Sequence, residues 1–334
     1  MSAATLVIQT AFLGDVVLTT PLLSALAAKY GPVDIITTPI AAPLLETHPA
    51  VRKVIAYDKR GRDRGWAGLR KLAQRLKSER YERAYLPHRS LRTAALALLA
   101  RIPSRIGFSS GWSFLYTEAR PKPRTGHETD RLLALANGAA GAYPPHLRPT
   151  AEDEQAPAAL VAGDFIALAP GSIWGSKRWP YYAELAQRLT EHVPVVLVGG
   201  PDDAELGEEI RRAAKGGEGR QKLINACGKL TLRQSAALIG RARALVTNDS
   251  APLHLATAMG TPIVALFGPT VTEFGFGPLR AGDIALGIDG LECRPCSPHG
   301  PPQCPLVHHR CMREITVAAV IAAIEELGAL RRRS

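Results

Sequence analysis

The sequence contains no apolar run that approaches the roughly 20 residues of a membrane-spanning helix. Residues 94–100 form the longest good candidate, and they match one core face of a helix. The N-terminal segment carries no basic leader, and Gln9 and Asp15 interrupt its apolar residues, which favours a first strand and helix over a signal peptide. We therefore expect a cytoplasmic protein.

Three signatures of nucleotide and nucleic-acid binding are also missing. The turn after the first predicted strand has no Gly-x-Gly-x-x-Gly fingerprint, which argues against a nicotinamide or flavin cofactor. The glycine-containing loop at residues 170–180 lacks the Gly-x4-Gly-Lys-Ser/Thr spacing of a Walker P-loop. Aromatic residues make up 6% of the chain and are few among its basic residues, so a base-stacking platform for nucleic acid is not expected.

Acidic residues are scarce in one stretch of the chain. Residues 52–105 hold 16 Lys or Arg and four Asp or Glu, so their net charge of +12 accounts for the +11 surplus of the whole protein. A basic surface of this kind suits an anionic partner, such as a phosphorylated lipid, a membrane face or nucleic acid. A surface that only keeps the protein in solution is the alternative interpretation.

The length and the order of apolar segments predict two domains. A chain of 334 residues with 46% hydrophobic composition can form two cores of ordinary size. Strand-like and helix-like segments alternate up to residue 137 and again from residue 165, which predicts parallel sheets covered by helices. The composition between them shifts to glycine, proline and polar residues, so we divide the chain into domains at residues 1–150 and 151–334. The predicted fold class is α/β, with two Rossmann-like, doubly wound domains that face each other across a cleft, where ligands bind at the carboxyl ends of strands.

The expected elements follow from the apolar pattern. In the first domain we expect strands at residues 5–10, 33–37, 54–57, 83–86 and 105–108, and helices at residues 16–29, 66–77, 91–99 and 128–137. In the second we expect strands at residues 165–169, 195–198, 223–224, 244–246 and 263–267, and helices at residues 181–190, 203–214, 232–239, 251–259 and 317–330. Pro21 should bend or delay the first helix.

The segment at residues 244–267 carries the most functional information. A buried strand leads to Asp249 and Ser250, which are good helix caps, and Pro252 suits the first helical turn. His254 lies near the start of the helix. A helix N-terminus at the carboxyl end of a parallel strand binds anions, most often phosphate. An ordinary, well-capped strand–helix turn is the alternative.

Two further loops carry candidate groups. Asp15 follows Gly14 at the start of the first helix, where a carboxylate can act either as a general base or simply as a helix cap. After the first strand of the second domain, Ser172, Ser176 and Lys177 supply hydrogen-bond donors and a positive charge. A surface loop whose tryptophan packs on the domain is the alternative interpretation of that second loop.

Four of the five cysteines lie close together in the sequence, at Cys293, Cys296, Cys304 and Cys311. Their spacing, C-x2-C-x7-C-x6-C, can close a tetrahedral zinc site of structural type. The alternative is a proline-rich loop with buried free thiols, since disulfides are rare in the cytoplasm.

With these loops in place, the chain resembles glycosyltransferase family 9, the ADP-heptose:lipopolysaccharide heptosyltransferases, and in particular their heptosyltransferase II branch. The resemblance covers nearly the whole chain. It is carried by Leu13-Gly14-Asp15 with Thr20-Pro21, Pro170-Gly171-Ser172 with Lys177-Arg178-Trp179-Pro180, Asn248-Asp249-Ser250 with His254, Phe267-Gly268-Pro269-Thr270, and Cys293-x-Pro-Cys296 with His308-His309-Arg310-Cys311-Met312.

The resemblance implies a GT-B fold and an inverting transfer that requires no cofactor or metal for catalysis. It assigns the general base to Asp15 and donor binding to Ser172, Lys177, Asp249, Ser250, Ala251 and His254, where Ala251 replaces a glycine common in the family. Acceptor binding is expected from the basic first domain, at Arg60, Arg62, Arg64, His88 and Arg89. The final helix, residues 317–330, would pack back onto the N-terminal domain.

The implied donor is ADP-L-glycero-D-manno-heptose, and the implied acceptor is the lipid A–Kdo–heptose core of a Gram-negative lipopolysaccharide. The enzyme would contact the anionic inner membrane peripherally from its cytoplasmic face. One rival is a family member with another nucleotide sugar or acceptor. A second rival, of a different class, is a non-catalytic basic protein that binds an anionic membrane or nucleic acid, and a third is a zinc-dependent enzyme that uses the cysteine cluster.

Overall fold

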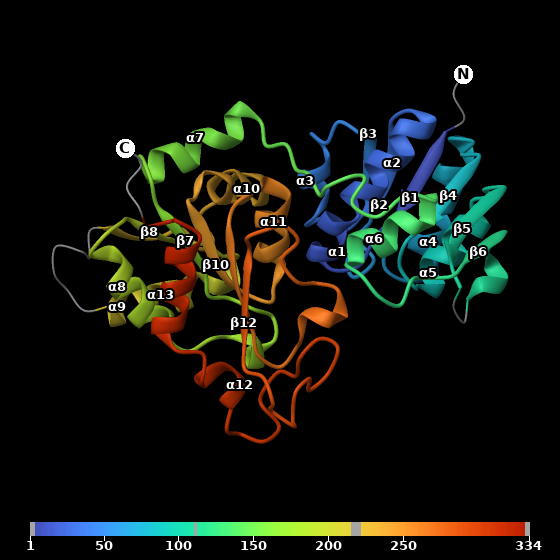
Figure 1. Ribbon diagram of the computed structural model, residues 1–334. Coiled ribbons are helices and arrows are strands. Elements are labelled where there is room, and N and C mark those ends of the chain that lie inside the picture. The colour runs from blue at the N-terminus through green and yellow to red at the C-terminus, as the bar shows by residue number, and fades with distance from the viewer. Residues whose placement is uncertain (1–3, 110–111, 215–221, 331–334) are drawn as a thin grey trace. The chain divides into compact units, whose positions relative to one another are not determined.

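The computed structural model describes residues 4–109, 112–214 and 222–330. Contacts between residues divide the chain into two compact units, residues 1–148 and 149–334 (Figure 1). Each unit holds one six-stranded parallel sheet, which confirms the α/β fold class. Within the described residues, no helix is long and apolar enough to cross a membrane.

The first sheet has the strand order β3-β2-β1-β4-β5-β6, with Val7 of β1 paired to Ile35 on one side and Tyr85 on the other. Its strands are β1 (Thr5–Ile8), β2 (Val33–Thr37), β3 (Val51–Ala56), β4 (Arg83–Leu86), β5 (Ser104–Phe108) and β6 (Glu118–Arg120). Its helices are α1 (Leu13–Leu18), α2 (Thr20–Tyr30), α3 (Ala42–Leu45), α4 (Gly65–Ser78), α5 (Leu91–Leu99) and α6 (Glu128–Leu133), with 3₁₀ turns η1 (Ser113–Leu115) and η2 (Ala134–Ala136). Apolar residues of α4 and α5 cover one face of this sheet, and α2 packs with β2 and α6.

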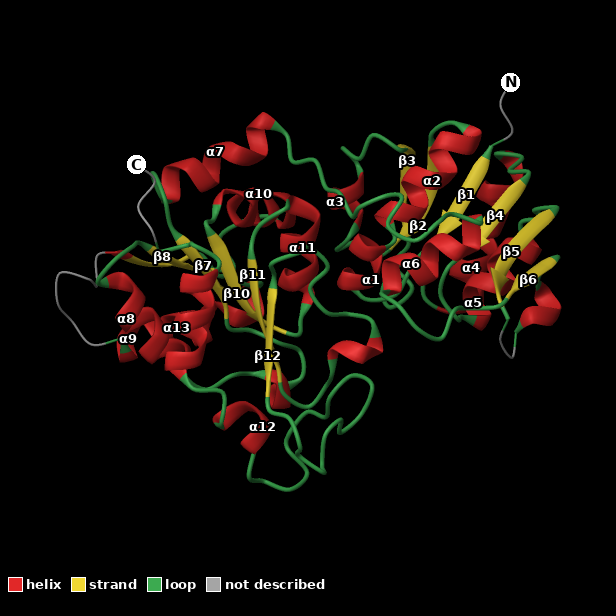
Figure 2. Ribbon diagram, in the orientation of Figure 1, coloured by secondary structure: helices red, strands yellow, loops and turns green. Residues whose placement is uncertain are grey.

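The second sheet repeats the same topology, with the order β12-β11-β10-β7-β8-β9. Its strands are β7 (Ile166–Ala169), β8 (Val195–Leu197), β9 (Leu223–Asn225), β10 (Ala244–Asn248), β11 (Ile263–Phe267) and β12 (Ile284–Gly287). Its helices are α7 (Ala151–Leu160), α8 (Tyr182–Thr190), α9 (Ala204–Ala213), α10 (Leu232–Arg241), α11 (Ala251–Met259), α12 (Arg310–Arg313) and α13 (Val317–Glu326), with 3₁₀ turns η3 (Gly175–Lys177), η4 (Pro201–Asp203) and η6 (Thr272–Phe274) (Figure 2).

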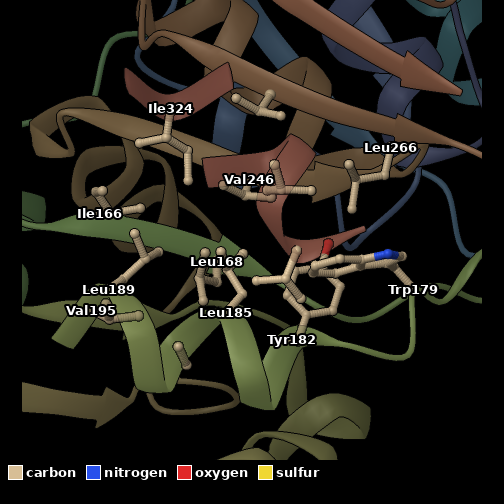
Figure 3. Close-up of a cluster of buried hydrophobic side chains, with 14 of the residues drawn as sticks. Ile166, Leu168, Trp179, Tyr182, Leu185, Leu189, Val195, Val246, Leu266 and Ile324 are labelled. Carbon is tan, nitrogen blue, oxygen red and sulfur yellow. The ribbon is translucent and has the colours of Figure 1, made fainter. Parts of the chain in front are cut away.

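The core of the second unit holds the end of the loop that follows β7. Trp179 and Tyr182 pack beside Leu168 and Leu185 under the sheet (Figure 3). Both aromatic residues are almost fully buried, so they anchor the chain immediately after the loop at residues 170–178. The loop is thus held at both ends, by β7 and by this aromatic pair.

Two expectations need correction. The helix expected at residues 16–29 is two helices, because the chain turns at Thr19 and Pro21 enters the first turn of α2. The polar run after residue 150, where only a domain boundary was expected, forms a helix, because Thr150 and Asp153 form a capping box that starts α7. Val320 and Ile324 of α13 are buried in the core of the second unit, and the predicted packing of this helix on the first domain stays a prediction.

Candidate functional site

Both sheets have the strand order 3-2-1-4-5-6 when the strands of each unit are counted from its own first strand. In such sheets the connections leave the first and fourth strands in opposite directions, and ligands bind outside the carboxyl ends at this switch point. The switch lies between β1 and β4 in the first unit and between β7 and β10 in the second. The predicted residues Asp15, His88, Ser172 and Asp249 all follow these four strands.

Asp15 is the third residue of α1 and is only partly buried. The helix begins earlier than expected, so Phe12 is the N-cap residue and its backbone N–H donates to Asp15 Oδ2 over 3.1 Å. Thr19 donates to the backbone oxygen of Asp15 at 2.7 Å and accepts from Gln9 Nε2 at 3.0 Å. The carboxylate therefore sits on a short, tightly bonded helical turn at the carboxyl end of β1.

Two basic side chains brace the segment that leads to Asp15, and only one of them was predicted. Lys59 donates to the backbone oxygen of Thr10 over 2.7 Å, and His88 hydrogen-bonds the backbone of Ile8. Burial, and then the charge of Lys59, lower the pKa of His88 to about 4, so His88 is neutral near pH 7. Burial also lowers the pKa of Lys59. His88 is therefore a neutral ring beside this loop, and its predicted part in acceptor binding stays a prediction.

The predicted arginines lie in one folded loop between β3 and α4. Asp58 accepts hydrogen bonds from the backbone N–H groups of Gly61 and Arg62, which lowers the pKa of this carboxyl. Arg92 of α5 clamps the other end of the loop by donating to the backbone oxygens of Asp63 and Gly65, each over 2.9 Å. The loop thus presents its basic side chains from a fixed backbone, and Arg60, Arg62 and Arg64 are all exposed, as is Arg89 after β4.

In the second unit, Asn248 joins the two loops of the switch point. Its side chain is fully buried and donates to the backbone oxygen of Pro170 over 2.9 Å. Its amide oxygen accepts from the backbone N–H of Trp179 at 3.2 Å and from the hydroxyl of Tyr182 at 3.3 Å. One amide side chain therefore fixes the loop after β7 against the end of β10.

The next residue, Asp249, pairs with Lys177. Lys177 Nζ lies 2.6 Å from Asp249 Oδ2, and the two side chains are 8% and 11% exposed. The same oxygen accepts a hydrogen bond from the hydroxyl of Thr270, also over 2.6 Å. A nearly buried carboxylate is expensive unless it is paired, so Asp249 holds the ammonium group of Lys177 in one place at the loop.

The start of α11 lies beside this pair. Ser250 is the N-cap residue, as predicted, but within the described residues its side chain makes no capping hydrogen bond to the helix, and its hydroxyl donates to the backbone oxygen of Asn248 over 3.4 Å. The helix therefore begins without a side-chain cap over the amides of Ser250 and Ala251. His254 is buried one turn further on, with its ring against Phe276. Ser172 is also buried, and its hydroxyl accepts from the backbone N–H of Trp174 at 3.2 Å.

The cysteine-containing loop supports this cluster from the outside. His309 Nε2 lies 2.7 Å from the backbone oxygen of Ser176, and the hydroxyl of Ser176 donates to the backbone oxygen of Pro301. Arg294 donates to the backbone oxygens of Gly268, Thr270, Phe267 and Ile288. The loop thereby fixes the backbone on both sides of the Lys177–Asp249–Thr270 cluster.

The four cysteines of this loop do not form the ligand set that a zinc ion needs. Among the residues that the structure describes, no three His, Cys, Asp or Glu side chains are grouped so that they could hold a metal ion. Cys311 packs into the hydrophobic core, where burial raises the pKa of its thiol to about 11. All four are free thiols in this structure.

A model of glycosyltransferase family 9 (heptosyltransferase) matches residues 69–303. The chain belongs to glycosyltransferase family 9. A lipopolysaccharide heptosyltransferase 2 from Salmonella typhimurium is 31% identical over 84% of this chain and 92% of its own length. A lipopolysaccharide heptosyltransferase 1 from Pseudomonas aeruginosa is 30% identical over 87% of this chain and 85% of its own length. The structure of the E. coli ADP-heptose lps heptosyltransferase II matches with a TM-score of 0.80 and 30% identity over 98% of each chain. These likenesses identify the chain as a glycosyltransferase and confirm the resemblance found in its sequence.

Several residues to which the sequence motifs gave no role also hold the site of this family 9 glycosyltransferase in place. Asn248 and Thr270 lie inside the motifs, but their partners are 78 and 21 residues away in the sequence. Lys59, Arg294 and His309 contact backbone oxygens that are 49, 26 and 133 residues away. The one local signal was the position of Asn248, a polar residue that ends an apolar strand.

Proposed function

We propose that this glycosyltransferase transfers heptose from ADP-L-glycero-D-manno-heptose to the inner core of lipopolysaccharide, with inversion at the anomeric carbon. The observation that carries the proposal is the cluster at the second switch point, where Lys177, Asp249, Ser250 and Ala251 come together as the motifs require. The proposed sugar and acceptor class follow from the relatives, which include an ADP-heptose lps heptosyltransferase II at 30% identity.

The donor diphosphate is bound by the second unit. Lys177 has three N–H donors, so it can bind a phosphate oxygen while it keeps its bond to Asp249. The amides at the start of α11 add the positive end of the helix dipole. Asp249 supports this lysine, because its Oδ2 accepts from both Lys177 and Thr270.

The acceptor is bound by the first unit. Its phosphorylated sugars carry negative charge, and the exposed guanidinium groups of Arg60, Arg62 and Arg64 provide charge-assisted donors on a rigid loop. Because this acceptor is a lipid, the enzyme works at an anionic membrane surface, in peripheral contact with it.

In the chemical step, the acceptor hydroxyl attacks the anomeric carbon of heptose from the face opposite to ADP. The new C–O bond forms as the bond between that carbon and the diphosphate oxygen breaks, and Asp15 accepts the hydroxyl proton. An ordinary Asp has a pKa of about 3.9, far below that of a sugar hydroxyl, so the proton moves late in the step. Lys177 and the amides of α11 stabilise the charge that grows on the departing diphosphate.

Mass spectrometry tests the proposal directly. The enzyme is incubated with ADP-heptose and a core that ends in Kdo. In a second reaction it is incubated with ADP-heptose and a core that ends in the first heptose. We expect the mass of one heptose to be added to the heptose-ended core, together with stoichiometric release of ADP. Addition to the Kdo-ended core instead would indicate the acceptor position of heptosyltransferase 1, whose Pseudomonas member is nearly as similar.

Failure to bind ADP or to transfer any sugar would refute the proposal. Transfer from a different nucleotide sugar would favour another member of the family, and binding to anionic membrane or nucleic acid without turnover would favour a non-catalytic basic protein. The reaction is also run with a metal chelator, and loss of activity in that reaction would favour the zinc-dependent enzyme.

A further inference from the structure

Helix α5 of the first unit is apolar on both of its faces. Ala94, Leu96 and Ala97 are buried against the sheet, while Leu98 and Leu99 on the other side are each 42% exposed. A surface helix normally carries polar residues on its outer face, and a helix that is apolar all round is normally covered. The outer face of α5 therefore has the composition of a surface that meets another apolar phase.

Two neighbouring segments extend this surface with aromatic rings. The turn η1 contacts α5. It contains Phe114 and directly follows Trp112, and the two rings pack edge to face with 6.4 Å between centroids. Phe114 is 75% exposed. At the start of α4, which packs along α5, Trp66 is 72% exposed. We call the exposed side chains of these three segments the apolar face: Trp66, Leu91, Leu98, Leu99, Trp112 and Phe114.

Positive charge is interspersed with the apolar face. Arg70 and Lys71 on α4, Arg89 before α5 and Arg101 after it are all exposed, within the stretch that carries the +12 net charge. Cores of protein–protein interfaces are depleted of lysine and of charge in general. Exposed tryptophan and phenylalanine beside Lys and Arg are instead typical of surfaces that bind the headgroup region of an anionic bilayer.

We propose that the apolar face is the membrane-docking surface of this protein and that its partner is the surface of an anionic phospholipid bilayer. This inference rests on the proposed function in one respect, the lipid acceptor. We call the loop between β3 and α4, which carries Arg60, Arg62 and Arg64, the arginine loop. Arg92 of α5 donates to the backbone oxygens of Asp63 and Gly65 at the end of this loop, so the apolar face adjoins the loop assigned to the acceptor. Docking by this face brings the enzyme's acceptor loop to the bilayer from which the sugar core projects.

Vesicle flotation tests the docking surface without any substrate. The full-length protein is mixed with vesicles of phosphatidylethanolamine and phosphatidylglycerol, or of phosphatidylcholine alone. We expect binding to the anionic vesicles that weakens with salt. The double variant Leu98→Ser, Phe114→Ser should bind at least about tenfold more weakly, since it removes two apolar side chains that the bilayer would bury. Leu306→Ser is the matched control, because Leu306 is an exposed apolar residue of the second unit, and it should bind like the wild type.

The other outcomes overturn the inference. Equal binding of the double variant and the wild type would exclude this surface. A change from dimer to monomer in the variant, with vesicle binding unchanged, would show that the face binds a second copy of the chain. Heptose transfer to a de-acylated, soluble core is measured in parallel and should be the same in the double variant and the wild type. If the wild type binds vesicles but transfers no heptose, the proposed function fails while the docking surface stands.

Discussion

Lys177 Nζ and Asp249 Oδ2 lie 2.6 Å apart where the loops after β7 and β10 meet, and both side chains are nearly buried. Such a pair does not by itself indicate a stable protein, because the cost of desolvating two charges offsets much of their attraction. Its value here is positional, since it keeps one ammonium group at the start of α11. The pair thus holds a flexible lysine in one position, from which we propose that it donates to the diphosphate.

The two members of this pair should respond differently to substitution. Lys177→Met removes a charge-assisted hydrogen bond to phosphate, so we expect the Kd for ADP to rise about ten- to hundredfold, corresponding to roughly 1.5–3 kcal/mol. Asp249→Asn keeps the ammonium group but leaves it without a counter-charge, so we expect a lower Tm and a smaller loss of ADP affinity. Calorimetric titration with ADP and thermal unfolding measure both effects. Unchanged ADP affinity in Lys177→Met would contradict the assignment.

Asp15→Asn separates the base from the helix turn that carries it. The amide oxygen can still accept the hydrogen bond from Phe12 N–H, so the fold and the affinity for ADP should be retained. Without a general base, kcat should fall about 10²- to 10⁴-fold. Steady-state release of ADP measures the change, with Asp164→Asn as the control, because Asp164 is a half-exposed carboxylate of the second unit whose partner is Arg243. A variant Asp15→Asn that turns over at the wild-type rate would mean that another group takes the proton.

The sheets and the switch-point loops could be predicted because their signals are local. Apolar runs such as residues 33–37 and 83–86 coincide with β2 and β4, and the small, polar segments after strands mark the loops that bind ligands. The edge strands β6 and β12 were missed, because Glu118–Arg120 and Ile284–Gly287 are short and contain no buried residue. Helix α7 was not predicted, although its capping box is visible in the sequence at Thr150 and Asp153.

The fine structure of the site could not be predicted, because it depends on contacts between distant segments. Lys177 and Asp249 are separated by 72 residues, and Ser176 and His309 by 133. We predicted donor binding for both Lys177 and Asp249, and what could not be predicted is that the two side chains pair with each other. The cysteine spacing suggested a metal site. Beside those cysteines, His309 contacts the backbone oxygen of Ser176, and Arg294 donates to the backbone oxygens of Gly268 and Thr270.

His309 offers a test of that bracing. His309→Ala removes the contact with the backbone oxygen of Ser176, and we expect ADP to bind about three- to tenfold more weakly, the effect of one ordinary hydrogen bond acting through the loop. His309→Gln retains a donor and should restore much of the affinity. The neighbouring His308 is the control, because its Nδ1 accepts from the backbone N–H of Arg310 rather than from the donor loop. Equal ADP affinity for His309→Ala and His308→Ala would show that the contact is only structural.

The arginine loop should govern the acceptor and leave the donor unaffected. Replacing Arg60, Arg62 and Arg64 together with glutamine leaves the backbone bonds to Asp58 in place, so the loop should keep its shape. We expect the KM for a phosphorylated core to rise about tenfold or more and to depend less on salt, because exposed charges interact through screened attraction. The KM for ADP-heptose should not change. Lys77→Gln, at the exposed end of α4, is the control, and a triple variant with an unchanged acceptor KM would place the acceptor elsewhere.

Two histidines of the first unit should make its stability depend on pH. Burial, then the charge of His146, lower the pKa of His48 to about 4, and burial, then the charge of Lys59, lower the pKa of His88 to about 4 as well. In the unfolded chain each has a pKa of about 6.5, so between these values the unfolded state binds protons that the folded state does not. The free energy of unfolding should therefore fall as the pH is lowered from about 6.5 towards 4, by at most about 1.4 kcal/mol per pH unit for each histidine.

Urea unfolding of the first unit, repeated between about pH 7 and pH 5, measures how its free energy of unfolding depends on pH. This range lies above the pH at which carboxylates dominate that dependence. In His48→Gln the neutral amide cannot take up the proton, so the slope should decrease even where the variant is less stable at every pH. His192→Gln, at an exposed position, should keep the wild-type slope. The same slope in His48→Gln and the wild type would mean that the buried ring of His48 is not what ties the stability of this unit to pH.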